Sequence, residues 1–108
     1  MARSLKLRHT NTIGLLITDI TNPLYSYLAD GVLSGANRHG YHVVFCENSE
    51  NPEMEKEYIK VLLEKRVAGI IAVPIGYNRN YWQENANFGI EVVFVDRKLR
   101  ICPILIPS

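Results

Sequence analysis

The sequence predicts an α/β fold, an open parallel sheet with helices on both faces. Apolar runs of strand length alternate along the chain with segments whose apolar residues recur at helical spacing. The resulting order of strand, helix, strand, helix, strand, helix and strand is typical of stacked right-handed βαβ units. The first run, residues 13–17, is almost continuously apolar, as expected for a strand covered on both faces of a parallel sheet.

This first run leads directly into a helix start. Asn22 is expected to cap the helix, and Pro23 to occupy its first position, where the missing N–H would have had no partner. Gly40 provides a left-handed stop, so the helix is predicted over residues 23–39. Its apolar face comprises Tyr25, Leu28, Ala29, Val32 and Ala36.

The same start signal recurs at Asn51 and Pro52. A second strand is predicted over residues 41–46, and the helix that follows Asn51 over residues 52–65. We expect the apolar stripe of this helix to face the sheet and its charged residues to face water. The stripe comprises Met54, Tyr58, Val61 and Leu62, and the charged face comprises Glu53, Glu55, Lys56 and Glu57.

Two more strands complete the central sheet. Residues 69–73 are predicted as a buried strand that ends at Pro74, because proline lacks the N–H that a central ladder requires. Residues 78–88 are weakly helical, and residues 90–95 form a fourth strand. The last apolar stretch predicts a short edge strand over residues 101–106.

Length and composition are those of one small globular domain. With 108 residues, of which 47% are hydrophobic and 21% charged, disordered and fibrous classes are excluded. The net charge of +1 excludes a strongly basic nucleic-acid domain but leaves a local basic segment open. No run reaches the roughly 18 apolar residues of a membrane span, and the N-terminus does not resemble a signal peptide, so we expect a cytoplasmic chain. Cys46 and Cys102 are expected to be buried free thiols.

Polar and aromatic side chains follow the strands at the carboxyl edge of the predicted sheet, where open α/β proteins bind ligands. They are Asp19, Asn22, Tyr25, Glu47, Asp96 and Arg97. Carboxylates accept hydrogen bonds from hydroxyl groups, a guanidinium donates in a fork, and an aromatic ring covers the apolar side of a sugar, so the set suits a neutral polyol. A structural interpretation stays open for each aspartate, which can cap a turn or form a surface ion pair.

The sequence argues against the commonest enzymes of this architecture. It contains neither G-x-G-x-x-G after the first strand nor G-x-x-x-x-G-K-[ST], the signatures of dinucleotide and P-loop sites. A phospho-acceptor receiver domain would carry an aspartate where Pro74 ends the third strand. His9, His39 and His42 do not gather into a metal or base site, and no nucleophile has an evident base, so an enzyme is the weaker hypothesis.

Four stretches also occur in a recognisable order. They are T-I-G-L-L-I-T-D-I-T-N-P-L-Y, L-A-D-G-V-L-S-G-A-N-R-H-G-Y-H-V-V-F-C, N-P-E-M-E-K-E-Y-I-K-V-L-L-E-K-R-V-A-G-I-I-A-V-P and V-F-V-D-R. Together with the start of the chain they cover residues 1–98 and resemble the LacI/GalR family of bacterial transcription regulators. The resemblance implies the first lobe of an effector-binding domain that is similar to periplasmic sugar-binding proteins, in which two α/β lobes close around a sugar or nucleoside.

The resemblance also implies roles for individual residues. One cleft element matches the D-x-x-N-P-F-F type, with Leu24 in place of an expected aromatic, and an Asp-Arg pair matches the one that bonds ligand hydroxyls in sugar-binding relatives. The implied ligand-binding residues are Asp19, Asn22, Leu24, Tyr25, Asp96 and Arg97.

The N-terminal arm is basic and has two interpretations. Its spacing alone favours a solvated terminus over a segment that orders against phosphates. The resemblance, however, makes A-R-S-L-K the end of a hinge helix and assigns Ala2 and Leu5 to the operator minor groove. Residues 1–11 are then a hinge-helix remnant and linker, and residues 12–108 an incomplete N-terminal lobe.

The expected protein is therefore a truncated LacI-type repressor without its helix-turn-helix and second lobe. In the intact repressor we expect the lobe to bind a small sugar-like effector as part of a homodimer, without a cofactor or metal, and to control binding to operator DNA. For the truncated chain alone we expect weak or absent sugar binding and no specific operator binding. A periplasmic-type sugar-binding protein is one alternative. A small α/β enzyme or receiver domain is another.

Overall fold

The computed structural model describes residues 10–75, 82, 90–96 and 101–102 of the chain. In these ranges, strands and helices follow one another much as the sequence predicts. Their bounds are β1 Thr12–Ile17, α2 Pro23–Arg38, β2 His42–Glu47, α3 Pro52–Glu64, β3 Gly69–Ala72, β4 Glu91–Val95 and β5 Ile101–Cys102. The helix predicted over residues 78–88 lies outside the described residues except for Trp82, which is helical.

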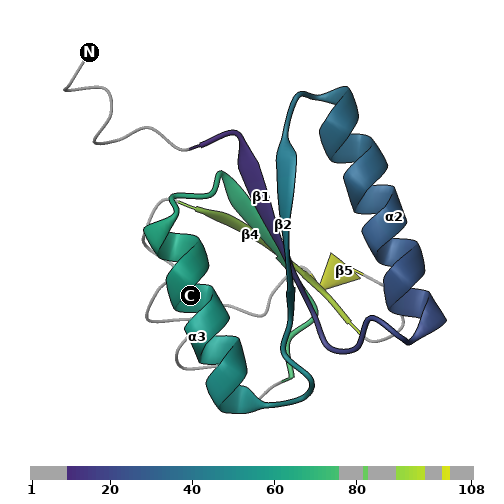
Figure 1. The fold of residues 1–108 in the computed structure, drawn as a ribbon, viewed down its shortest axis with the longest axis vertical. Coiled ribbons are helices and arrows are strands. Elements are labelled where there is room, and N and C mark those ends of the chain that lie inside the picture. Colours follow the sequence, from purple (N-terminus) through teal and green to yellow (C-terminus); the bar gives the residue numbers. More distant parts are fainter. Residues whose placement is uncertain (1–9, 76–81, 83–89, 97–100, 103–108) are drawn as a thin grey trace.

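The strands form one sheet in the order β2-β1-β3-β4-β5 (Figure 1). β1 pairs in parallel with β2 and β3, and β3 pairs in parallel with β4, which confirms the predicted parallel sheet. β5 pairs with β4 at the edge in the antiparallel direction. This direction follows from the short connection between β4 and β5, because a parallel crossover needs a dozen or more residues.

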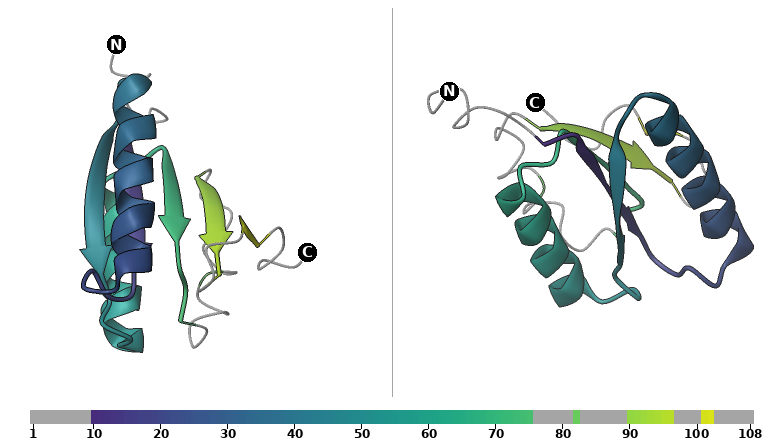
Figure 2. Two further views of the ribbon diagram at one scale, coloured as in Figure 1. Left: turned by 90° about the vertical axis from the view of Figure 1, so that its right-hand side faces the viewer. Right: turned by 45° about the horizontal axis from the view of Figure 1, so that its top comes forward.

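The two helices cover opposite faces of the sheet (Figures 1 and 2). Leu15 and Ile17 of β1 pack with the buried face of α2, whereas Leu16 packs with that of α3. All three side chains are fully buried, because successive residues of a strand point to opposite faces and both faces are covered here. The predicted two-sided burial of β1 is thereby confirmed.

Both predicted helix caps are also confirmed. Asn22 Oδ1 accepts a hydrogen bond from the Leu24 N–H at 3.0 Å, and Asn51 Oδ1 accepts from the N–H groups of Glu53 and Met54. A proline follows each cap at the first position of the helix. No helix in the described ranges has the length and apolar character needed to cross a membrane.

The buried face of α3 differs from the predicted stripe. Glu55, expected to face water, is fully buried, and Met54, expected to face the sheet, is 38% exposed. The buried residues Glu55, Ile59 and Leu62 stand at i, i+4 and i+7, so the helix is rotated by about one residue from the predicted orientation. Glu55 tolerates this position because it has hydrogen-bond donors on two neighbouring segments.

One of the two cysteine predictions is confirmed. Cys46 is a buried free thiol on β2, and burial raises its pKa to about 11. The side chain of Cys102 lies outside what the structure describes.

Candidate functional site

The parallel register aligns the ends of four strands at one edge of the sheet. One row of paired residues crosses these strands and consists of Cys46 on β2, Leu16 on β1, Ala72 on β3 and Phe94 on β4. Asp19, Glu47, Pro74 and Asp96 follow them within three residues and therefore emerge at the same edge. Since β3 lies between β1 and β4, the two strands that lead to the aspartates are two strand spacings, about 10 Å, apart.

Asp19 follows β1 in a turn that leads into α2. Its Oδ1 accepts hydrogen bonds from the Thr21 hydroxyl at 2.6 Å and from the Thr21 N–H at 3.0 Å. These bonds, the hydroxyl first, lower the pKa of Asp19 below its usual value of 3.8, because they favour the charged form. Asp19 is therefore a fixed carboxylate at neutral pH, able to accept a hydrogen bond from a ligand hydroxyl.

Glu47, at the end of β2, borders the same turn. Its Oε2 accepts a hydrogen bond from the Ile20 N–H at 3.0 Å and so links β2 to the segment between β1 and α2. Beside it lies a cavity of about 280 Å³, which is lined by Thr18, Asp19, Glu47, Ser49 and Glu50. Its lining supplies mainly carboxylate and hydroxyl oxygens, so it suits hydrogen-bond donors.

Of the residues that line this cavity, the sequence interpretation overlooked Thr18, Ser49 and Glu50, and Thr18 is the most deeply buried of the three. It is 1% exposed, and its hydroxyl has no hydrogen-bond partner in the described part of the chain. The sequence does show that Thr18 lies between the buried strand β1 and Asp19, and this position could have suggested a place in the site. It could not show that the Thr18 hydroxyl is buried.

The three residues expected to contact a ligand from the start of α2 differ in exposure. Asn22 uses its side-chain oxygen for the helix cap, which leaves the amide group as a donor. Leu24 is 48% exposed beside the cap. Tyr25 is 3% exposed and packs in the apolar cluster between α2 and the sheet, so its ring is part of the hydrophobic core.

The other predicted site residues are placed only in part. Asp96 is partly buried directly after β4. Arg97, its expected partner, lies outside the described residues, as do Ala2 and Leu5 of the N-terminal arm.

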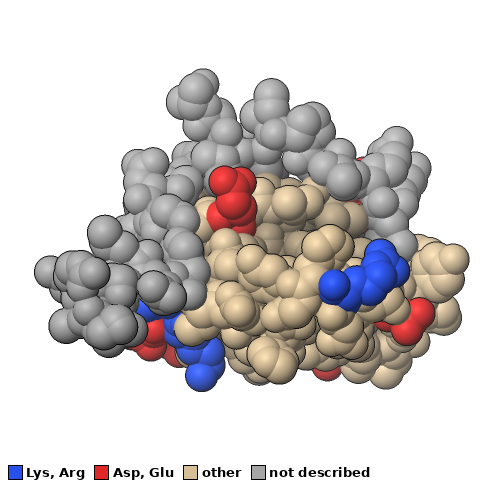
Figure 3. All heavy atoms as spheres, turned by 90° about the horizontal axis from the view of Figure 1, so that it is seen from above, with Lys and Arg blue, Asp and Glu red and all other residues tan. Residues whose placement is uncertain are grey.

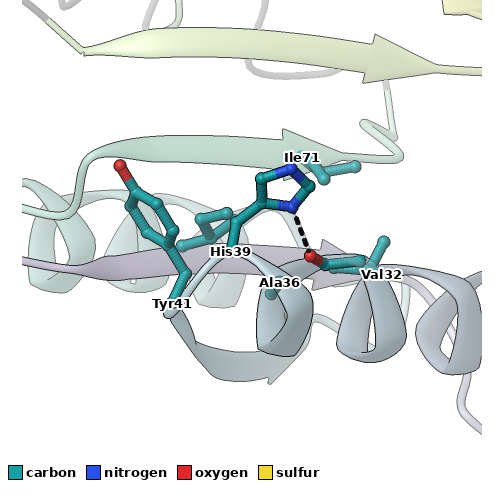
Figure 4. A pocket seen from close by; sticks show the side chains of 7 residues that line it. Val32, Ala36, His39, Tyr41 and Ile71 are labelled. Atoms are coloured by element: carbon teal, nitrogen blue, oxygen red, sulfur yellow. Dashed lines mark hydrogen bonds between the residues drawn. The ribbon is translucent and has the colours of Figure 1, made fainter.

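Two other cavities lie at the opposite end of the sheet, and both are lined mainly by apolar side chains. One, of about 390 Å³, lies between α2 and the sheet, and Figure 4 shows the side chains that line it. Its most polar side chain, His39, already bonds the Gly35 carbonyl through Nδ1 at 2.9 Å. Figure 3 views the side on which β1 begins, where most of the visible atoms of the described residues belong to uncharged residues, with a few charged groups among them. This cavity offers few polar groups that could orient a ligand, so the carboxyl edge is the stronger candidate for a polar ligand.

Metal binding has no support in the described residues. Histidine, cysteine, aspartate and glutamate do not form a group of three or more there that could hold a metal ion.

The sequence matches known proteins over nearly its whole length. Residues 10–107 match the family model described as periplasmic binding proteins and sugar binding domain of LacI family. The ribose operon repressor of Bacillus subtilis is 40% identical over 103 residues, which are 95% of this chain and 31% of that protein. The repressor PurR of Vibrio campbellii is 44% identical over 73 residues, 68% of this chain and 22% of PurR. The chain thus spans a third or less of these relatives.

The fold matches solved structures of the same kind. A periplasmic binding protein/LacI transcriptional regulator from Alkaliphilus metalliredigens, solved in complex with D-xylulofuranose, superimposes with a TM-score of 0.67 and 36% identity. The match covers 80% of this chain and 31% of that one.

Proposed function

Because this chain belongs to the family of periplasmic binding proteins and LacI-type sugar-binding domains, we propose that it is part of the ligand-sensing lobe of a LacI-type transcriptional repressor. We propose that its effector is a small sugar, and that pentoses are the first candidates to test. A ribose operon repressor and a xylulose-bound regulator among the similar proteins support this choice. The lobe binds and does not catalyse.

One observation of the structure carries the proposal. The parallel register delivers Asp19, Glu47 and Asp96 to one edge of the sheet, with the cap Asn22 and the exposed Leu24 beside them. Carboxylates and an amide can bond several hydroxyl groups of a sugar, and an apolar side chain can contact its C–H face. The proposed ligand contacts are Asp19, Asn22, Leu24, Tyr25, Asp96 and Arg97, with Tyr25 contributing at most the rim of its buried ring.

The proposed regulation couples this edge to DNA. A second lobe of the full-length protein would close over the effector, and the closed state would differ from the open one in its affinity for the operator. An effector that prefers one state shifts the population between them. In this proposal the protein is a cytoplasmic homodimer, and Ala2 and Leu5 lie in the hinge that contacts operator DNA.

The proposal is tested by transplanting the chain into a relative. Residues 10–107 replace the matching third of the Bacillus subtilis ribose operon repressor, and calorimetry measures D-ribose and D-xylulose affinity. We expect the chimera to bind one of these pentoses, and Asp19→Ala or Asp96→Ala to weaken binding at least about ten-fold, the effect of losing a hydrogen bond to a charged group. Glu64→Ala is the control, an exposed carboxylate at the far end of α3.

Two outcomes would contradict the proposal. A folded chimera that binds neither pentose would refute the effector, and pentose binding that does not change operator affinity would refute the repressor role in favour of a periplasmic-type binding protein. Turnover of the sugar that is lost in Asp19→Ala would instead support the enzyme alternative.

A further inference from the structure

Glu55 is a buried carboxylate that the proposed site does not use. It lies in the first turns of α3 and is fully buried, although glutamate is seldom fully buried unless it is paired. A buried charge must be compensated by hydrogen bonds or ion pairs, because leaving water is costly for a carboxylate. The position of its partners therefore indicates what this residue does.

Two of these partners lie on loops at the carboxyl edge. Glu55 Oε2 accepts a hydrogen bond from Asn48 Nδ2 at 3.2 Å and one from the Ile75 N–H at 3.3 Å. Asn48 follows β2, and Ile75 follows β3. A single carboxylate oxygen therefore links the loops that leave two strands on either side of β1.

Asn48 transmits this link to the cavity beside Asp19. It is fully buried, its N–H donates to the Ile17 carbonyl at 2.9 Å, and its Oδ1 accepts from the Glu50 N–H at 2.8 Å. Glu50 lines the cavity but is not joined to Glu55 by these bonds. The relay thus runs from Glu55 through Asn48 to the wall of the proposed site.

The turn at Ser49 and Glu50, which forms part of the cavity wall, needs support from neighbouring residues because of its backbone conformation. Ser49 and Glu50 have φ values of 53° and 61°, in the left-handed region that residues with a Cβ rarely adopt. The Ser49 N–H also donates to the Thr18 carbonyl at 3.0 Å, which attaches the turn to the end of β1. Strained turns persist where surrounding contacts hold them in place.

We propose that Glu55 is a positioning residue of the ligand edge: through Asn48 it holds the Ser49–Glu50 turn in the geometry that shapes the cavity, and through the Ile75 N–H it attaches the segment after β3 to the same edge. The effect of this positioning on ligand binding rests on the proposed function. The hydrogen bonds of Glu55 to Asn48 and Ile75, called the clamp below, do not rest on it, because they are contacts within this chain.

Hydrogen exchange of the 108-residue chain without ligand tests the clamp. In Glu55→Ala, we expect the Glu50 amide to exchange at least about ten-fold faster, although it loses no direct partner, while amides of β1 such as that of Leu16 keep their rates. Glu55→Gln retains an oxygen acceptor and is expected to restore slow exchange. Val67→Ala is the matched control, since Val67 is also fully buried but precedes β3 at the opposite end of the sheet.

The outcomes separate positioning from general stability. Unchanged Glu50 exchange in Glu55→Ala, or an equal local increase in Val67→Ala, overturns the proposal. If Glu55→Ala does not fold, Glu55→Asp, which shortens the side chain by one methylene, is read at the same Glu50 amide. Unchanged Glu50 exchange in Glu55→Asp then overturns the proposal.

Pentose affinity of the chimera then tests the consequence. We expect about ten-fold weaker binding in Glu55→Ala, near-normal binding in Glu55→Gln and no change in Val67→Ala. If the parent chimera binds no pentose, the proposed function fails, whereas the exchange result still decides on the clamp. If the parent binds and Glu55→Ala binds equally well, Glu55 does not position the site.

Discussion

The turn after β1 shows how one neighbouring residue fixes the charge of a candidate ligand group. Thr21 supplies both hydrogen bonds to Asp19 Oδ1, one from its hydroxyl and one from its N–H. The hydroxyl contributes most to lowering the pKa of Asp19. The carboxylate is thus kept charged and oriented by a residue only two positions away.

Removing this hydroxyl should be visible in a titration. We expect Thr21→Val to raise the pKa of Asp19 toward 3.8, without reaching it because the N–H bond remains, and Thr21→Ser to leave it low. Since the folded pKa lies below the unfolded one, the interaction stabilises the fold above pH 3.8 and is lost as the pH falls through the folded pKa. Carboxyl-carbon NMR measures the pKa, and equal values in Thr21→Val and the parent would contradict the assignment.

At the scale of elements, the contact between β1 and α3 depends on a glycine. A Cβ placed on Gly14 would lie 2.7 Å from Cδ1 of Leu62, which is fully buried in the cluster under α3. A Cβ at this position would therefore force the buried Leu62 side chain to shift.

We expect Gly14→Ala to destabilise the chain by about 1–3 kcal/mol through overpacking. The penalty should shrink in a Leu62→Ala background, where the clash is absent, so the two substitutions are not additive. Urea denaturation measures both. Gly31→Ala on α2 is the control, because a Cβ there meets nothing within 4 Å; it should be neutral or stabilise by up to about 1 kcal/mol. Equal costs at the two glycines would refute the packing argument.

At the scale of the whole molecule, the described sheet is covered unevenly. On the face that carries α2, Val93 of β4 is 40% exposed, and it borders an apolar hollow of about 270 Å³ together with Ile13 and Ile71. Phe45, on the edge strand β2, is 43% exposed. Exposed apolar surface next to a free sheet edge favours association.

We therefore expect the 108-residue chain to self-associate as its concentration rises, and Val93→Lys to shift it toward the monomer. Asn37→Lys adds the same charge at an exposed polar position of α2 and should not change the association. Sedimentation velocity over a concentration series measures both. A parent chain that stays monomeric throughout would contradict the expectation.

The order of the described elements, the caps at Asn22 and Asn51 and the parallel sheet could be predicted from the sequence, because these depend on local periodicity, capping chemistry and chain connectivity. The sequence also placed Asp19 and Asp96 at a common edge, which follows from parallel topology. The rotation of α3, the burial of Glu55 and Tyr25 and the enclosed hydroxyl of Thr18 became visible only in the folded chain. The side of a helix that turns inward is set by packing partners distant in sequence, such as Asn48 and Ile75 for Glu55, and local periodicity does not contain them.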